Sequence, residues 1–186
     1  MTLIESLYAQ GIRALRNPRA AAADVMQLGV PREALAPALL LVAVLAVLLD
    51  YGLGLATPDV ALVGSPFRML FIYMAVTVAF RVAVTVVGRW FGGSGTFEDA
   101  LLLTIFLQAM LIPVSALQIV LALVVPFLAM LFILAVAVLL FWIQVNFVAA
   151  LHGFSGLGRA FAVTLIVSFA VALVLTPFIL PPAGGV

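Results

Sequence analysis

The chain has 186 residues, of which 67% are hydrophobic and only 8% are charged, and its formal net charge is +1. A water-soluble domain of this length needs far more polar residues to cover its surface, and so small a net charge excludes a general attraction to nucleic acid. The chain has no cysteine, which excludes disulfides, thiolate nucleophiles and cysteine-ligated metals.

Residues 1–33 are predicted to form a cytoplasmic or interfacial amphipathic segment. Its apolar side chains recur at helical spacing: Leu3, Ile4, Leu7, Tyr8, Ile12 and Leu15. We expect this helix to lie in the membrane interface with its apolar face toward the lipid, or to pack on the cytoplasmic face of the bundle. Asn17-Pro18 interrupts it, and a second short helix is expected from Arg19 to about Leu28. No cleavable signal peptide is evident, because the first 35 residues contain no continuous apolar run.

Residues 34–182 are predicted to form a five-span transmembrane domain. A transmembrane helix needs about 20 apolar residues to cross the hydrocarbon core. The expected spans are about 36–56, 67–90, 99–119, 123–151 and 157–180. The predicted fold class is therefore all-α: a polytopic transmembrane helix bundle of about five spans, preceded by an amphipathic interfacial helix.

Turn and capping residues separate the spans. The run Gly92–Gly95 breaks the chain after the second span, and Thr96 with Asp99 resembles a capping box that starts the third. Pro113 predicts a kink near the middle of the third span. The short, uncharged connection to the fourth span predicts a tight antiparallel hairpin.

The arginines predict the orientation in the membrane. With five spans, six of them share one side: Arg13, Arg16, Arg19, Arg32, Arg89 and Arg159. Arg68 lies on the other side. Because cytoplasmic loops carry an excess of basic residues, the N-terminus is expected to be cytoplasmic and the C-terminus outside.

Polar side chains within the spans mark a candidate site, since such groups are costly in lipid and usually face the bundle interior. The candidate intramembrane polar cluster comprises Thr77, Arg81, Thr85, Gln108, Gln144 and Asn146. Arg81 is the only charge well inside a span. We expect its side chain either to extend toward the cytoplasmic interface or to pair with Gln144, Asn146 or Gln108.

The fifth span carries a row of small residues at every fourth position, which is a candidate helix-packing face. The row consists of Ala160, Thr164, Ser168 and Ala172. The polar positions of all spans can be packing seams or can line a path for a solute or ion. Packing is favoured because interhelical hydrogen bonds in membranes average only ~0.6 kcal/mol and because no carboxylate lies at the centre of a span.

The turn after the fourth span contains a short catalytic signature. Gly153-Phe154-Ser155-Gly156 matches the G-x-S-G motif of rhomboid intramembrane proteases. The only histidine, His152, is three residues before the serine, and that spacing in a glycine-rich turn is a poor nucleophile–base pair. One histidine and no cysteine leave no credible His/Cys metal site. We therefore expect no catalytic residues, no cofactor and no metal, and a protein that is not an enzyme.

Four stretches together resemble a known family. They are Asn17-Pro18-Arg19-Ala20-Ala21, Pro31-Arg32-Glu33-Ala34-Leu35, the stretch from Gly88-Arg89-Trp90-Phe91-Gly92 to Ala100, and the stretch from Trp142-Ile143-Gln144 to His152-Gly153-Phe154. In order and spacing they resemble the bacterial branch of the Yip (Ypt-interacting protein) domain family over about residues 12–175. The resemblance implies a five-helix membrane domain with a cytoplasmic N-terminus, and we expect it in the bacterial inner membrane. The eukaryotic Asp-Leu-Tyr-Gly-Pro hallmark is absent, so the association of the family with Rab-type GTPases is not carried over.

These features favour a non-enzymatic accessory or scaffold protein of the inner membrane. Its expected partners are the lipid bilayer and other integral membrane proteins or a membrane complex, with a homo-oligomer as a further arrangement and no nucleic acid. The alternative is a small transporter or channel that uses the polar stripes of the second and third spans. A distant third is an intramembrane serine hydrolase at Ser155.

Overall fold

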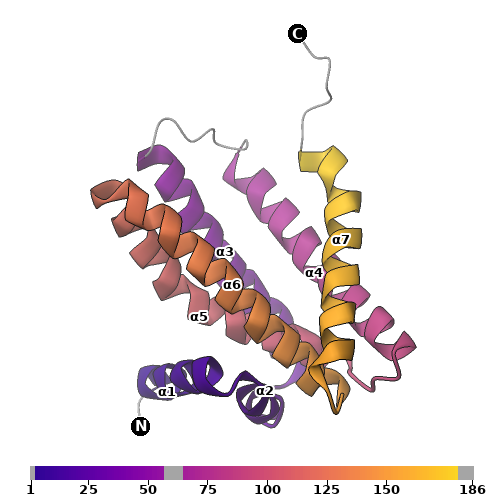
Figure 1. Ribbon diagram of the computed structural model, residues 1–186. Helices are drawn as coiled ribbons and strands as arrows, with labels where there is room; N and C mark the ends of the chain where they lie inside the picture. The colour runs from indigo at the N-terminus through magenta and orange to yellow at the C-terminus, as the bar shows by residue number, and fades with distance from the viewer. Residues whose placement is uncertain (1–2, 57–64, 180–186) are drawn as a thin grey trace.

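The computed structural model describes residues 3–56 and 65–179, and within these ranges the chain is built from helices and turns alone. The helices are α1 (Leu3–Arg16), α2 (Pro18–Met26), α3 (Arg32–Ala56), α4 (Pro66–Trp90), α5 (Phe97–Val124), α6 (Pro126–His152) and α7 (Leu157–Ile179) (Figure 1). Helices α3 to α7 are each long and apolar enough to cross a membrane, so the predicted five-span, all-helical class is confirmed. The predicted division at residue 33 stays a prediction, and residues 180–182 lie outside the described ranges.

Capping side chains explain where several helices begin. The Asn17 side chain accepts a hydrogen bond from the backbone N–H of Ala20 at 3.2 Å, which separates α2 from α1. Thr96 caps α5 as predicted: its hydroxyl oxygen accepts from the Asp99 N–H at 3.1 Å and donates to the Asp99 carboxylate at 2.6 Å. Such caps satisfy N–H groups that have no partner within the helix.

The connection between the third and fourth spans is shorter than the sequence suggested. We expected the third span to end near residue 119 and the fourth to begin near residue 123, but α5 continues past Pro113 to Val124 and α6 begins at Pro126. Only Val125 separates the two helices. Apolar helix-forming residues continue α5 until Pro126, whose ring disfavours helical backbone at the residue before it and suits the first position of the next helix.

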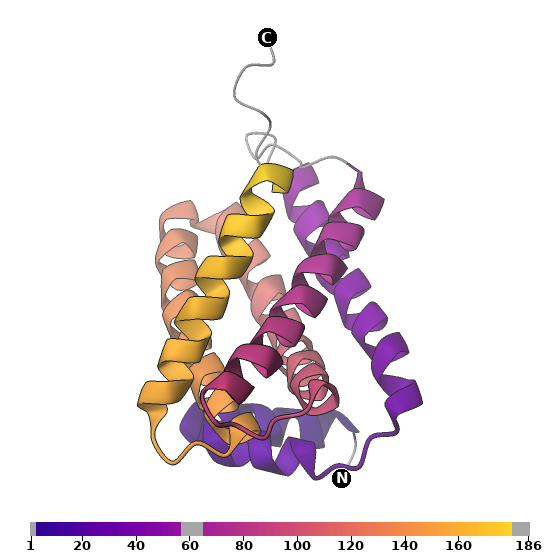
Figure 2. The ribbon, with the colours of Figure 1, turned by 90° about the vertical axis from the view of Figure 1, so that its right-hand side faces the viewer.

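The short helices α1 and α2 lie across one end of the bundle, and the long helices run alternately away from that end and back to it (Figures 1 and 2). The turns at residues 91–96 and 153–156 also lie at this end. Six arginines belong to the segments gathered there: Arg13, Arg16, Arg19, Arg32, Arg89 and Arg159. We call the half of the bundle at this end the packed half.

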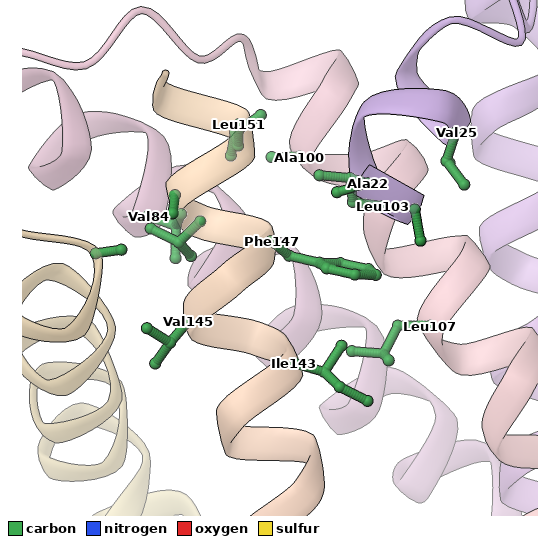
Figure 3. Packing of buried hydrophobic residues seen from close by; sticks show 14 of the residues in the cluster. Ala22, Val25, Val84, Ala100, Leu103, Leu107, Ile143, Val145, Phe147 and Leu151 are labelled. Atoms are coloured by element: carbon green, nitrogen blue, oxygen red, sulfur yellow. The ribbon is translucent and has the colours of Figure 1, made fainter. Parts of the chain in front are cut away.

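The main core fills the packed half. Its buried side chains come from α2, the last turns of α4 and α6, and the first turns of α5 and α7. Figure 3 shows Phe147 pointing from α6 toward Ala22 of α2 and Leu103 of α5. The Phe147 ring also stacks on Phe106 with 6.3 Å between ring centroids. The helix α2 is therefore part of the core and not a loose attachment.

In the opposite half of the bundle, which we call the open half, α6 and α7 expose most of their side chains, whereas α3 still packs on α5 through Val42. From Pro126 to Trp142, α6 exposes most side chains and contacts α5 along a narrow seam that includes Ala129. In α7, residues 169–174 are exposed apart from the half-buried Val171. Helices that touch few neighbours here must be covered by lipid or by another protein.

The difference between the two halves predicts how phenylalanine truncations act. Phe147→Ala should lower the free energy of unfolding by about 3–5 kcal/mol, because it leaves a cavity between α2, α5 and α6. Phe169→Ala is the matched control, since that ring is 80% exposed, and it should change stability little. Thermal or denaturant unfolding in one detergent measures both. Equal losses for the two variants would contradict the division into halves.

Candidate functional site

The candidate site is a junction at which the C-terminal ends of α4 and α6 meet. Both helices end in a glycine with left-handed backbone, Gly92 at φ 83° and Gly153 at φ 66°. In α4, Gly93 N–H donates to the Gly88 carbonyl and Gly92 N–H to the Arg89 carbonyl, both at 2.9 Å. This pairing is the Schellman motif, which satisfies the last carbonyls of a helix.

The end of α6 has the same motif. Phe154 N–H donates to the Ala149 carbonyl at 3.0 Å, and Gly153 N–H to the Ala150 carbonyl at 3.2 Å. A bond from Ser94 N–H to the His152 carbonyl at 3.4 Å joins the two helix ends directly. Two distant helix ends thus meet backbone to backbone.

The ring of His152 occupies a space enclosed by three glycines. A Cβ atom added at Gly88 would lie 2.1 Å from the ring, one at Gly93 would lie 2.4 Å from it, and one at Gly95 would lie 2.8 Å from it. Real side-chain carbons do not approach other atoms so closely, so a larger residue at any of these positions must displace the ring or the backbone. His152 is 3% exposed and is stacked on Phe154 with 5.4 Å between ring centroids.

Both nitrogens of the His152 ring have hydrogen-bond partners. Nδ1 accepts from the backbone N–H of Gly95 at 3.2 Å, and Nε2 lies 3.2 Å from the Val84 carbonyl oxygen. Because a carbonyl only accepts, Nε2 carries the hydrogen, and this arrangement uses the neutral imidazole fully. The ring ties α6 to both α4 and the turn that follows it.

Two arginine side chains donate hydrogen bonds to backbone carbonyls of the turns at the junction. Arg19 of α2 donates to the backbone carbonyls of Phe154 and, at 3.4 Å, of Ser155. Arg89 donates through Nε to the Gly95 carbonyl at 3.3 Å. Carbonyls at helix ends and turns have free lone pairs, and arginine satisfies them with charge-assisted hydrogen bonds.

This geometry does not assemble a rhomboid-type pair. Both nitrogens of His152 are engaged by α4 and the turn after it, whereas Ser155 is exposed. A base that activates a serine needs a free nitrogen within hydrogen-bond reach of the hydroxyl. Within the described ranges there is also no group of three or more metal-ligating side chains. The arrangement is suited to holding helices together.

The structure brings together only part of the predicted intramembrane polar cluster. Gln108 of α5 donates to the Thr77 hydroxyl of α4 at 3.5 Å, and in the described chain this is the one hydrogen bond that joins side chains of two cluster members. Thr85 instead donates to the Arg81 carbonyl at 2.8 Å.

The other cluster members make no hydrogen bond between their side chains in the described chain. Asn146 donates to the Trp142 carbonyl of its own helix at 2.9 Å. Gln144, two residues earlier in the same helix, is half-buried. The Arg81 guanidinium lies over the Phe80 ring, 5.0 Å from its centroid. In the described part of the chain Arg81 makes no hydrogen bond with the three amides considered as its partners.

The predicted packing face of α7 is occupied along part of its length. Ala160 and Thr164 are buried, and the Thr164 hydroxyl donates to the Ala160 carbonyl at 2.8 Å. Ser168 is half-buried and Ala172 is exposed. The first two residues of the row therefore lie in the packed half, and Ala172 lies in the open half.

Sequence reasoning did not identify His152 as an organising residue. A lone histidine next to a serine attracted attention as a catalytic candidate, whereas its partners are more than 50 residues away in sequence. A usable signal was present: two of the stretches that carry the family resemblance contain Gly88, Gly93 and Gly95 on one side and His152 on the other. Those two stretches are the ones that meet at the junction.

Five long apolar helices closed at one end by two short helices and a buried junction define a polytopic helical membrane protein. A family model described as the Yip1 domain matches residues 12–179, which is most of the chain. The protein therefore belongs to the Yip1 domain family, as its sequence features suggested. No curated protein matches the chain, and no solved structure does.

The glycine enclosure predicts a strong effect from a single methyl group. Gly88→Ala should destabilise the protein by about 1–3 kcal/mol, because the added carbon overlaps the His152 ring. Alanine favours helix over glycine, so a loss cannot come from helix propensity. Unfolding in detergent measures the change.

Two further variants isolate the cause. Gly158→Ala in α7 is the matched control, since an added Cβ there meets no atom within 4 Å. The double variant Gly88→Ala with His152→Ala should lose less free energy of unfolding than the two single variants together, because removing the His152 ring leaves room for the Cβ atom at position 88. Additive losses would show that the two residues do not compete for one volume.

Proposed function

We propose that the protein is a non-enzymatic accessory or scaffold protein of the inner membrane that binds other integral membrane proteins or lipids. The observation that carries this proposal is the open half. Large apolar side chains there are exposed on several helices at once: Phe67 and Phe71 on α4, Phe127 and Val138 on α6, and Phe169 and Leu173 on α7.

The packed half also supports this proposal, because it holds the helices together. The junction, α2 and the main core join the helices rigidly at one end, so the open half can present its surfaces without the bundle coming apart. Association in a bilayer depends on close packing and not on a hydrophobic driving force. A bundle anchored at one end and uncovered at the other is suited to receive a partner helix.

The transporter alternative receives less support from the polar side chains. The hydroxyls of Thr85, Thr104 and Thr164 and the amide of Asn146 all bond to carbonyls of their own helices, one turn back. Groups satisfied in this way do not form a continuous polar path between helices. Away from the His152 junction, two hydrogen bonds between spans are found in the described chain: Gln108 donates to Thr77, and the Gln118 amide donates to the Ala129 carbonyl.

We also propose that the packed half faces the cytoplasm. Six arginines belong to its segments, whereas Arg68 begins α4 at the opposite end. The excess of basic residues on cytoplasmic loops then places the N-terminus inside and the C-terminus outside.

Single cysteines test this orientation cleanly, because the chain has none of its own. Ser155→Cys at the packed end and Ser65→Cys at the opposite end are both exposed positions outside the helices. A membrane-impermeant maleimide added to intact cells, with the outer membrane permeabilised where there is one, should label the cysteine at 65 and not the one at 155. The reverse pattern would place the packed half outside.

Site-specific crosslinking tests the scaffold proposal. A photoreactive residue at Leu173, in the open half, should capture a discrete membrane-protein partner in native membranes, identified by mass spectrometry in stoichiometric amount. The same residue at Val163, which is buried in the packed half, is the matched control and should capture none. Capture of lipid alone from several open-half positions would contradict the binding of membrane proteins and leave lipid as the bound partner, and capture of a second copy of this chain alone would contradict an accessory role.

A further inference from the structure

Arg81 lies on the face of α4 that points into the bundle. Thr77, Val84, Thr85 and Gly88 are the buried residues of this helix. Arg81 falls within their stripe, because residues spaced by three or four positions share one face of a helix. It lies nine residues, or about 14 Å along the axis, before Trp90 at the helix end.

Arg81 forms no ion pair in the described chain, and the group whose charge interacts with it is the Tyr73 hydroxyl, two turns earlier on the same helix. The ion pairs found among the described residues join Arg13 to Asp24 and Arg32 to Glu98, both at the packed end. The Nε atom of Arg81 is fully buried without a hydrogen-bond partner. Its terminal nitrogens make no hydrogen bond within the described chain, and the guanidinium lies over the Phe80 ring. An arginine at membrane depth normally pairs with an anion or a carbonyl.

A second unpaired group lies one helical turn away. Gln108 donates its amide N–H to Thr77, which precedes Arg81 by one turn of α4, and its Oε1 atom is buried without a partner. The two groups have opposite requirements: the guanidinium needs an acceptor, preferably an oxyanion that can take two of its N–H groups, and the Gln108 oxygen needs a donor.

We propose that Arg81 and Gln108 form an intramembrane binding site for a ligand that carries an oxyanion and, about one helical turn away, a hydrogen-bond donor. A phosphate bearing a hydroxyl or an ammonium group has this chemistry. A phospholipid headgroup such as phosphatidylglycerol supplies it, and so does a small solute such as hydrogen phosphate. Phosphatidylcholine has the phosphate but no donor. The site does not depend on a protein partner, so it stands apart from the scaffold proposal.

Thermal unfolding of the full chain in a non-ionic detergent tests the site, with short-chain phosphatidylglycerol, short-chain phosphatidylcholine or inorganic phosphate added in separate titrations. Phosphatidylglycerol should stabilise the protein at a concentration at least about tenfold lower than phosphatidylcholine. Arg81→Gln should raise that concentration about tenfold, because glutamine lacks the charged fork. Gln108→Met should remove the preference for phosphatidylglycerol over phosphatidylcholine.

Arg16→Gln is the matched control, since this exposed arginine of α1 lies outside the site and should leave both titrations unchanged. Stabilisation by inorganic phosphate that also requires Arg81 would identify a small anion as the ligand of the same site. Equal responses to the two lipids, or a response to phosphatidylglycerol that Arg81→Gln does not weaken, would overturn the proposal. If Arg81→Gln does not fold, Arg81→Lys decides, because it keeps the charge without the fork: unchanged affinity would likewise overturn the site.

Discussion

The imidazole ring of His152, which fits among three glycines, holds the ends of α4 and α6 together, and the packing of the helices in the packed half depends on this contact. His152 reaches α4 only because Gly88 leaves room in the helix and Gly93 and Gly95 leave room in the turn. The ring then donates a hydrogen bond to the Val84 carbonyl of α4 and accepts one from the Gly95 N–H of the turn. In a bilayer, where apolar burial adds little, close backbone approach and satisfied polar groups are what bring helices together.

The two halves of the bundle follow from this constraint. Near the junction, large side chains such as Phe106 and Phe147 are buried together with small ones, and α2 covers this core through its alanines and Val25. Farther along, the helices carry large apolar side chains such as Phe67, Phe127 and Phe169, which stay exposed. Such faces are acceptable to lipid, so nothing in the chain itself has to close them. The same property makes them available to another membrane protein.

The polar side chains separate into two kinds by how their hydrogen bonds are met. The hydroxyls of Thr85, Thr104 and Thr164 and the Asn146 amide bond to carbonyls of their own helices. Arg81, Gln108 and Gln118 instead keep buried atoms without a partner inside the described bundle, where such atoms are costly. Polarity within a span is therefore a weak guide to function, whereas an unsatisfied polar atom at a defined place is a stronger one.

The sequence by itself determined the class of protein, the number of long helices, the capping of α5 and the family, because these depend on hydropathy, local hydrogen bonding and motif order. It misplaced the end of α5 by a few residues, since apolar periodicity does not show which residue before Pro126 is the last helical one. Only the tertiary structure decided that His152 belongs with Gly88, Gly93 and Gly95, and that Asn146 bonds to its own helix and not to Arg81. Those outcomes depend on how helices from distant parts of the chain rotate and tilt against one another, and a stripe on one helix carries no information about which partner it will face.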